Sequence, residues 1–393
     1  MHKLHVLAMA LITTTAGASA ASAQQADLFG FGSHGGSHVY VMSNDKGLNS
    51  VAVLKRDAIG RLDKVGVFRT GGRGVGTGTT APPPDPLGSQ NALLLSDDGH
   101  FLFAVDAGSN EVSTFLVLGD RLLLIDVTDS GGTYPVSLAQ HGNELYVLNS
   151  AGQANVTGFR IGLFGTLSKV HGSTRLIGTD EALVGNQPNV GNTATQLQFD
   201  RTGRWLAVSV KDSRAKGFIE MFAVDRSGEL AKDPEITLSR DTAAFGFTFD
   251  DQDNLLIAEA GANAVSSYTI ERDGDLRVVS QSVPTGQAAT CWLDANRHYA
   301  FTANAGSSTL TGFRVDGHGR LSPMTTDGVA ANLGAGHAPT DVKFSSDGRS
   351  LYVNTPGTGG VSAFAVREDG ELVPLGETPV FSAFSGTQGL AVQ

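Results

Sequence analysis

One carboxylate in the chain has surroundings suited to acid–base chemistry. Glu259 ends an apolar stretch in "NLLIAEAGANAVSSY", between small residues. A carboxylate partly removed from water can have a raised pKa and can serve as a general base. The apolar stretches elsewhere in the chain are followed by amides, an aspartate or a lysine, namely Asn44, Asp106, Asn149, Lys211, Asn304 and Asn354. Such side chains also cap turns through their own hydrogen bonds, so a structural interpretation stands beside the functional one.

A second group of polar residues opens other apolar stretches. Asp341 in "PTDVKF" and Gln196 in "ATQLQF" take the same place, and Thr290 matches them in "ATCWLD". We expect these side chains to point toward a common centre or its wall. His337 lies just ahead of Asp341, where an imidazole can act as acid or base near pH 7, and a solvated loop histidine is the alternative interpretation.

A third group is basic. Lys211, Arg214 and Lys216 fall within one short segment, and Arg73 stands in a long glycine-rich insertion. A local positive charge in an acidic protein can attract a carboxylate or a sugar acid, while solubility and surface ion pairs are the alternative explanation. We therefore predict two sets of site residues. The catalytic set is Glu259, Asp341 and His337, and the substrate-binding set is Gln196, Thr290, Lys211, Asn304, Asp106 and Asn149.

Other catalytic signatures do not occur in the chain. No G-x-S-x-G stretch lies between a strand and a helix, neither H-E-x-x-H nor C-x-x-C is present, and the histidines lack ligand spacing. We expect neither a metal nor a cofactor. Cys291 is the only cysteine, which excludes a disulfide within the chain, and its apolar neighbours indicate a small buried residue rather than a nucleophile.

The elements that must position these residues form a repeat. Its clearest part, such as "HFLFAVD" or "SLYVNT", starts at His38, His100, Asn143, Arg204, Asn254, His298 and Ser350. Each copy is followed by a loop and then by a stretch of period-two alternation, which is typical of a strand with one buried face. A tight turn, often Asp-Gly, comes next. A fourth stretch then begins near Leu62, Leu122, Leu167, Leu230, Leu276, Leu321 and Leu372.

The part that precedes the clearest one has one copy too few. The missing copy resembles "TQGLAVQ", residues 387–393, at the end of the chain. A first sheet completed by that segment closes a ring and removes exposed strand edges. We therefore predict an all-β fold, a seven-bladed β-propeller with four antiparallel strands per blade, the first closed by the C-terminal strand. A propeller of six or eight blades and an open repeat are the alternatives.

The loops indicate which face of the ring would work. The long insertions at 71–90, 179–192 and 331–339 all enter an innermost strand. In an antiparallel blade these loops share a face with the connections from second to third strand, where the polar residues lie. Long loops on one side of a rigid scaffold commonly carry binding sites, so we predict the site at the channel mouth on this top face.

The repeated phrase carries a resemblance. "S-x-D-G-R-x-L-Y-V-x", with a downstream "G-x-L", resembles the seven-bladed lactonase-like propeller family, which includes propeller-type 6-phosphogluconolactonases and carboxymuconate-lactonising enzymes. The resemblance implies this fold across the mature chain and lactone chemistry. Family members often carry a histidine in a Pro-x-His turn and a glutamate after a second strand. Glu259 resembles the glutamate, whereas Asp341, Gln196 and Thr290 stand where the histidine would be.

The N-terminus predicts export. An apolar stretch from Leu4 to Ala10 leads to the small-x-small signal "ASA" at 21–23, so we expect a signal peptide over 1–23, a linker over 24–37 and the propeller over 38–393. A membrane anchor is the alternative, but a spanning helix needs about 20 apolar residues. We expect no membrane span after cleavage, and a periplasmic or secreted protein.

The net charge of the chain limits the classes of binding partner that we expect. The formal net charge of −11 over 393 residues argues against nucleic-acid binding, which depends on lysine and arginine at phosphates. We expect a monomer that takes a small-molecule substrate or ligand. The sequence thus predicts an exported lactonase-like propeller that hydrolyses a lactone or related cyclic ester. The alternative is a non-catalytic exported propeller that binds a small ligand, a glycan or a protein.

Overall fold

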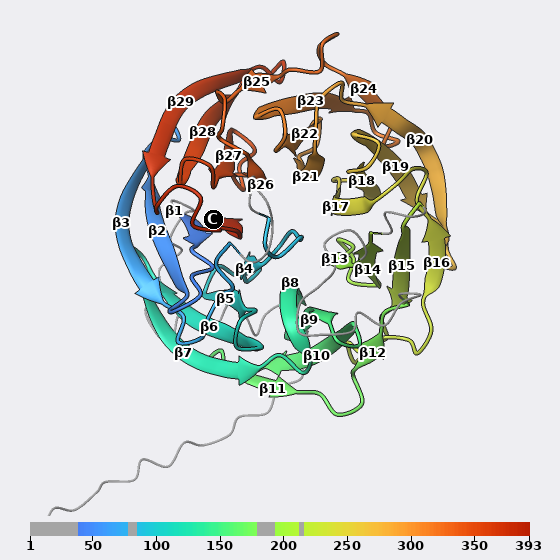
Figure 1. The fold of residues 1–393 in the computed structure, drawn as a ribbon. Coiled ribbons are helices and arrows are strands. Elements are labelled where there is room, and N and C mark those ends of the chain that lie inside the picture. Colours follow the sequence, from blue (N-terminus) through green and yellow to red (C-terminus); the bar gives the residue numbers. More distant parts are fainter. Residues whose placement is uncertain (1–37, 78–84, 179–192, 212–215) are drawn as a thin grey trace, which may run out of the picture. The chain divides into compact units, whose positions relative to one another are not determined.

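The repeat folds into seven antiparallel sheets, as predicted. The computed structural model describes residues 38–77, 85–178, 193–211 and 216–393, and their regular secondary structure consists of strands alone. Figure 1 shows the sheets as blades placed around one axis, with one strand of each blade innermost. The predicted signal peptide (1–23) and linker (24–37) lie outside the described residues.

Blades 1 to 3 contain the following strands, given from the axis outward. Blade 1 has β30 (Leu390–Val392), β1 (His38–Met42), β2 (Ser50–Arg56) and β3 (Leu62–Arg69). Blade 2 has β4 (Leu93–Leu95), β5 (Phe101–Asp106), β6 (Glu111–Leu118) and β7 (Arg121–Asp129). Blade 3 has β8 (Thr133–His141), β9 (Glu144–Ala151), β10 (Asn155–Ile161) and β11 (Leu167–Lys169), and β12 (Arg175–Leu176) also pairs with β10.

Blades 4 to 7 repeat this order. Blade 4 has β13 (Ala194–Phe199), β14 (Trp205–Val210), β15 (Phe218–Ala223) and β16 (Glu235–Leu238). Blade 5 has β17 (Ala244–Phe249), β18 (Asn254–Glu259), β19 (Ala264–Ile270) and β20 (Leu276–Pro284). Blade 6 has β21 (Thr290–Ala295), β22 (Tyr299–Asn304), β23 (Thr309–Val315) and β24 (Leu321–Pro323), with β25 (Ala331–Asn332) beside β23. Blade 7 has β26 (Thr340–Phe344), β27 (Ser350–Thr355), β28 (Gly360–Val366) and β29 (Leu372–Pro379).

The start of one fourth strand was predicted wrongly. In blade 4 the predicted Leu230 makes only an isolated bridge with Val224, and β16 begins at Glu235. Pro234 stands between them and has no N–H to donate to a ladder, which explains the delayed start.

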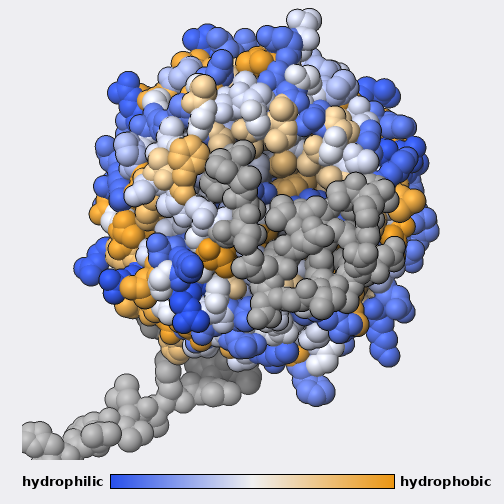
Figure 2. Space-filling model, viewed as in Figure 1, coloured by the Kyte–Doolittle hydropathy of each residue, from blue (hydrophilic) through white to orange (hydrophobic). Residues whose placement is uncertain are grey.

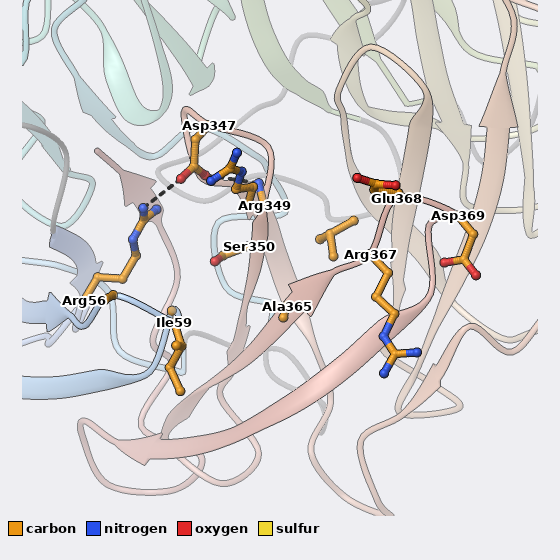
Figure 3. Close-up of a pocket in the computed structure, with 12 residues that line it drawn as sticks. Arg56, Ile59, Asp347, Arg349, Ser350, Ala365, Arg367, Glu368 and Asp369 are labelled. Atoms are coloured by element: carbon orange, nitrogen blue, oxygen red, sulfur yellow. Dashed lines mark hydrogen bonds and ion pairs between the residues drawn. The ribbon is translucent and has the colours of Figure 1, made fainter.

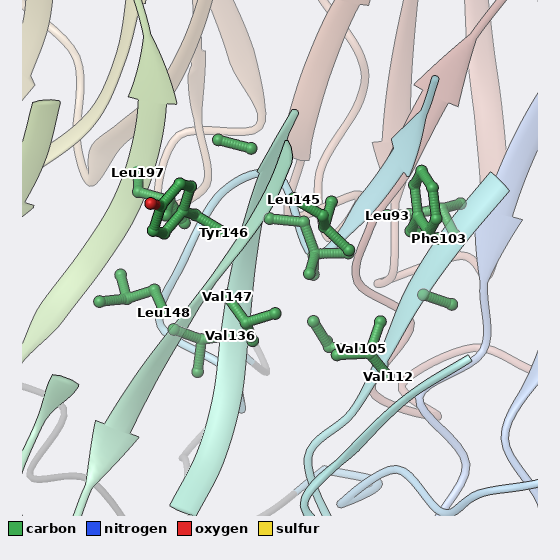
Figure 4. Packing of buried hydrophobic residues seen from close by; sticks show 14 of the residues in the cluster. Leu93, Phe103, Val105, Val112, Val136, Leu145, Tyr146, Val147, Leu148 and Leu197 are labelled. Carbon is green, nitrogen blue, oxygen red and sulfur yellow. The ribbon is translucent and has the colours of Figure 1, made fainter. Parts of the chain in front are cut away.

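The core lies between neighbouring blades. β18, β22 and β27 are the second strands of their blades, and every one of their residues is buried. The reason is that each second strand is covered by a neighbouring blade on both of its faces. Figure 4 shows this packing where Leu93 and Phe103 of blade 2, Leu145 of blade 3 and Leu197 of blade 4 belong to one apolar cluster. Truncating such a side chain to alanine typically costs about 2–5 kcal/mol.

The C-terminal strand closes the ring, as predicted. β30 pairs antiparallel with β1, with Leu390 opposite Val41 and Val392 opposite Val39. Leu390 belongs to an apolar cluster that also contains Tyr352 of blade 7, so the same residue joins the first and last blades. No helix among residues 38–77, 85–178, 193–211 and 216–393 is long and apolar enough to cross a membrane.

A β-bulge opens most innermost strands. In β26, Thr340 and Val342 pair with consecutive residues of β27, which leaves Asp341 as the extra residue. By the same pattern the extra residue is Cys291 in β21, Thr195 in β13 and Val136 in β8. A bulge re-aims the side chain of its extra residue. The register therefore corrects the predicted equivalence: Asp341 corresponds to Cys291 and Thr195, not to Thr290 and Gln196.

Candidate functional site

Residues 85–92, the axial segment, bring the blades together at the axis. The segment leads from blade 1 into β4, yet its partners come from distant blades. Tyr134 in blade 3 donates from its hydroxyl to the Pro86 carbonyl at 2.8 Å, and Trp292 in blade 6 donates from Nε1 to the Ser89 carbonyl at 2.8 Å. A segment that contacts blade 3 and blade 6 at once must lie at the centre of the ring.

Gln90 extends this bridging across the ring. Its side chain donates from Nε2 to the Leu293 carbonyl at 2.9 Å and accepts from the Leu293 amide at 3.1 Å, so it acts as an extra strand partner for β21. A Cβ built on Gly246 of blade 5 would lie 2.5 Å from the Gln90 Oε1 atom. It would also lie 2.7 Å from the backbone carbonyl oxygen of Cys291, so glycine at 246 is required by the close approach of blade 6 together with the axial segment.

Five polar side chains gather around the axial segment, and we call them the axial cluster. They are Asp85, Lys211, Cys291, Asp341 and Gln388. Gln388 donates from Nε2 to Asp85 Oδ1 at 2.8 Å. Asp85 interacts electrostatically with Lys211, with Cys291 and with Asp341. The cluster thus unites the loop after blade 1, the end of β14, two inner-strand bulges and the C-terminal segment.

Lys211 contacts both the axial segment and an aromatic ring of blade 5. Its Nζ atom donates to the Gly88 carbonyl at 3.2 Å and lies 4.4 Å from the ring centroid of Phe245, a cation–π geometry. Burial lowers the pKa of Lys211, and the negative charge of Asp85 opposes that change. The side chain is 4% exposed, so its charge acts in a poorly solvated place.

Asp341 has the most unusual environment in the cluster. It is 2% exposed and its Oδ2 accepts a hydrogen bond from the Gly389 amide at 2.7 Å. Burial raises the pKa of Asp341 to about 7; the Gly389 bond and Lys343 oppose this increase, and Asp85 adds to it. Its φ of 34° is a strained value for a residue with a side chain, and such strain is common at functional sites.

The two remaining titratable groups face more open surroundings. Asp85 and Cys291 both keep part of their surface exposed, unlike Lys211 and Asp341. Burial is the main cause of a raised pKa for Asp85, against Lys211, Gln388 and the Gly88 amide. Burial also raises the pKa of the Cys291 thiol to about 12, so the thiol is protonated at neutral pH. Figure 2 shows the surface hollowed near the axis on one face of the propeller.

The predicted base Glu259 lies elsewhere. Its carboxylate has no exposed surface, and Oε1 accepts hydrogen bonds from the Ser239 hydroxyl and the Asp241 amide, both at 2.8 Å. Ser239 and Asp241 belong to the connection between blades 4 and 5. Glu259 therefore fixes that connection to the end of β18, and its catalytic role remains a prediction.

The equivalent residues of other blades make similar contacts. Asp106 accepts from the Thr70 hydroxyl at 2.7 Å, and Asn149 donates to the Ser130 carbonyl at 3.1 Å; both partners lie in the connection from the preceding blade. Asn304 accepts from the Thr290 hydroxyl at 2.7 Å, within blade 6. These three predicted substrate contacts are buried among such partners and the structure does not bring them to the axial cluster.

Gln196 and Thr290 hold the inner strands. Gln196 donates to the Phe247 carbonyl and accepts from the Phe247 amide, both at 2.7 Å, which joins β13 to β17. The Thr290 hydroxyl donates its hydrogen bond to Asn304, as described above. Both side chains are fully buried, so their predicted contacts with substrate remain predictions.

His337 and the basic group are also separated. His337 lies 3.1 Å from Oε2 of Glu377 on β29, the outermost strand of blade 7, and so faces away from the axis. Arg214 lies outside the described residues, and Arg73 and Lys216 are exposed. Of the predicted site residues, the structure brings Asp341 and Lys211 together in one cluster.

Two members of that cluster escaped the sequence analysis. Asp85 stands within the proline-rich part of the insertion at 71–90, and Gln388 precedes the closing strand. Each lies in a segment that stands out in the sequence by its length or its position, and not by residues that could do chemistry. The polar residue at the end of a long insertion into an inner strand was the available signal for Asp85.

A separate hollow of about 860 Å³ lies at the junction of blades 7 and 1. Figure 3 shows it between the turns after β2, β26 and β28, with Arg56 paired to Asp347 at 3.0 Å. None of the predicted site residues lines this hollow. Among the residues that the structure describes, no three or more His, Cys, Asp or Glu side chains are grouped to hold a metal ion.

Comparison with known proteins gives the fold. No family model and no curated protein matches the chain. Solved structures match along nearly its whole length, among them a protein from Lactobacillus plantarum (TM-score 0.70, 14% identity, 91% of this chain and 99% of that one). A proposed 6-phosphogluconolactonase from Bacteroides fragilis matches with a TM-score of 0.64 and 15% identity over 92% of this chain and 99% of its own.

A third similar structure is a periplasmic gluconolactonase from Pseudomonas aeruginosa. Its TM-score is 0.66 at 16% identity, with 91% of this chain and 98% of that chain covered. At these identities the likeness concerns the fold, and it confirms the seven-bladed architecture that the repeat predicted.

Proposed function

We propose that this chain hydrolyses a lactone or a related cyclic ester at the axial cluster. The observation that carries the proposal is the convergence of Asp341, Lys211 and Asp85 at the axis, with Asp341 held near neutral pKa. Carboxylates and amines with perturbed pKa values that meet in one place are candidates for catalysis. Two structures of the same fold that are described as lactonases make this reaction class the natural first choice.

Asp341 would act as the general base. Lactone opening begins when a base removes a proton from water while the water oxygen forms a bond to the carbonyl carbon. One oxygen of Asp341 is engaged by the Gly389 amide, and among the described residues Oδ1 has no hydrogen-bond partner. A base with a pKa of about 7 is deprotonated in a large fraction of molecules at neutral pH and still accepts a proton well.

Lys211 would stabilise the charge that develops. Attack converts the carbonyl oxygen into an oxyanion, and an ammonium in a poorly solvated site favours that charge more than water does. When the intermediate collapses, the ring carbon–oxygen bond breaks and the departing oxygen takes the proton that Asp341 received. One lactone and one water thus yield one hydroxy acid, and the carboxylate returns to its starting form.

Export remains part of the proposal. The N-terminal pattern over residues 1–23 supports a signal peptide, and the Pseudomonas aeruginosa structure of this fold belongs to a periplasmic protein. We therefore propose that the chain works in the periplasm or outside the cell on a small-molecule lactone. Comparing the N-terminal residue of the protein recovered from a periplasmic fraction with that of the full chain would test cleavage after Ala23.

The deciding experiment is hydrolysis of a panel of sugar and aliphatic lactones, followed by proton release. Asp341→Asn and Lys211→Met should each lower kcat/KM by about 100-fold or more, the usual effect of removing a base or an oxyanion donor. Glu259→Gln tests the base that the sequence predicted. Activity that survives Asp341→Asn but not Glu259→Gln would reverse the assignment. Saturable lactone binding without turnover would replace the enzyme with a ligand-binding propeller.

A further inference from the structure

The C-terminal segment does more than pair with β1. Gln388 precedes β30, is 1% exposed, and makes three hydrogen bonds to the axial segment. Its Nε2 donates to Asp85 Oδ1 at 2.8 Å and to the Ser89 carbonyl at 2.9 Å, while its Oε1 accepts from the Leu87 amide at 3.0 Å. One amide side chain thereby fixes the position of Asp85 and of the backbone that follows it.

The next residue holds the second acid. The Gly389 amide donates to Asp341 Oδ2 at 2.7 Å, and its carbonyl accepts from the Met42 amide of β1 at 3.1 Å. Gly389 has a φ of 106°, which only glycine adopts without strain. Two consecutive residues of the closing segment therefore bind the two carboxylates of the axial cluster.

We infer that Gln388 is a positioning residue for the axial site, and that the site is assembled only when the C-terminal segment docks. Closing the ring places Gln388 against Asp85, which in turn sets the charge that faces Lys211 and Asp341. The catalytic meaning of this inference rests on the proposed lactone hydrolysis. The positioning of Asp85 by Gln388 does not depend on that reaction, and it can be measured without any substrate.

The chain contains a built-in reporter for that measurement. Cys291 is the only cysteine, is partly exposed, and interacts electrostatically with both Asp85 and Lys211. Its rate of alkylation by iodoacetamide depends on the fraction of thiolate and on access, both of which the axial cluster controls. The rate is followed from pH 6 to 10 on the folded protein and is normalised to the rate in denaturant.

Gln388→Met keeps the size of the side chain but removes every hydrogen bond to Asp85 and the axial segment. Loss of the Nε2 donor weakens the negative charge of Asp85 and loosens residues 85–89. We expect alkylation of Cys291 to accelerate by about threefold or more, the change that half a pKa unit produces. In the lactone assay the same variant should shift the pH profile of kcat rather than KM alone.

Gln393→Met is the matched control. Gln393 is a glutamine of the same segment, but its side chain lies near His38 Nδ1, at the other end of β30. This control should leave alkylation within about twofold of wild type, below the half-unit change expected for Gln388→Met. If Gln388→Met fails to unfold cooperatively, Gln388→Asn replaces it, because the shorter amide keeps a polar group in this buried place but withdraws the Nε2 donor from Asp85.

The outcomes separate the two proposals. A wild-type alkylation profile in Gln388→Met, or equal acceleration in both glutamine variants, overturns the positioning role of Gln388. Absence of lactone turnover in the wild-type protein overturns the proposed reaction, and the thiol measurement still decides whether ring closure assembles the cluster.

Discussion

Burial raises the pKa of Asp341, and it does the same for a second acid far from the axial cluster. Glu220 on β15 is 1% exposed, and burial raises its pKa to about 7, opposed only by a hydrogen bond from the Gly178 amide at 2.9 Å. Both carboxyl groups bind a proton more tightly in the folded state than in the unfolded chain. Each therefore makes the stability of the propeller depend on pH.

The first prediction concerns Asp341. Its folded pKa of about 7 exceeds its unfolded value of about 4, so between these pH values the folded state keeps a proton that the unfolded chain has released. Wild-type stability should fall as pH rises from about 4 to 7, by at most about 4 kcal/mol. Asp341→Asn keeps the acceptor for Gly389 and should lack this decrease, so its advantage over wild type grows across that window. Urea unfolding from pH 4 to 8 measures it, and a constant difference would contradict the assigned burial.

The second prediction applies the same reasoning to Glu220. Glu220→Gln preserves the oxygen that accepts from Gly178 and removes a carboxyl whose folded pKa is raised to about 7. The variant should be more stable than wild type above pH 7, by at most about 3 kcal/mol, and equal to it below about pH 4. Unlike Asp341→Asn, it should hydrolyse lactones. Thermal melts at pH 4 and pH 8 separate this result from a general change in packing.

At the scale of elements, the ends of three second strands anchor the connection from the preceding blade. Asp106 binds Thr70, Asn149 binds Ser130, and Glu259 binds Ser239 and Asp241. Because the connection from one blade enters the inner strand of the next, an anchor at this point fixes the angle between two blades. At these three positions the polar residue that the sequence marked as a candidate for chemistry has a structural role in the assembly of the ring.

The third prediction tests that anchoring at Glu259. Glu259→Ala removes the acceptor of two hydrogen bonds and should lower the free energy of unfolding by about 2–6 kcal/mol, since each donor left without a partner costs about 1–3 kcal/mol. Glu259→Gln keeps an oxygen for Ser239 and Asp241 and should lose clearly less. Equal losses in the two variants, measured by urea unfolding, would show that these bonds do not fix the connection.

Local chemistry explains why the sequence predicted so much of the fold. Strand alternation, turn residues and the truncated copy at 387–393 are all short patterns, and together they determined blade number and closure. The axial cluster depends instead on which residues meet across the ring. Asp85 and Gln388 are 303 positions apart, and only the closed ring puts them 2.8 Å from each other. Asp341 was predicted, but its bulge was not, because a bulge is visible only in the pairing of two strands.

At the scale of the whole molecule, stability depends on the last strand. β30 contributes Leu390, which is 1% exposed in the cluster between blades 7 and 1, and it covers the inner edge of β1. Without it, β1 presents unpaired backbone groups toward the axis and the axial cluster loses Gln388.

The fourth prediction is that deleting residues 387–393 abolishes cooperative unfolding or causes aggregation. Leu390→Ala is the milder test, because it keeps the strand and removes only buried apolar surface, at a cost of about 2–5 kcal/mol. Calorimetry and light scattering follow both variants. A deletion variant that melts like the wild-type protein would contradict closure by β30.

The pairing of β30 with β1 also sets an order of events in time. A ribosome completes the strands of blades 2 to 7 before it adds residues 390–392, so blade 1 cannot be finished until synthesis of this segment is over. A contact between partners some 350 residues apart is slow to form, because a long chain must be closed first. The ring therefore stays open for as long as this segment is missing, and the axial cluster, which needs Gln388 and Gly389, is the last part of the molecule to form.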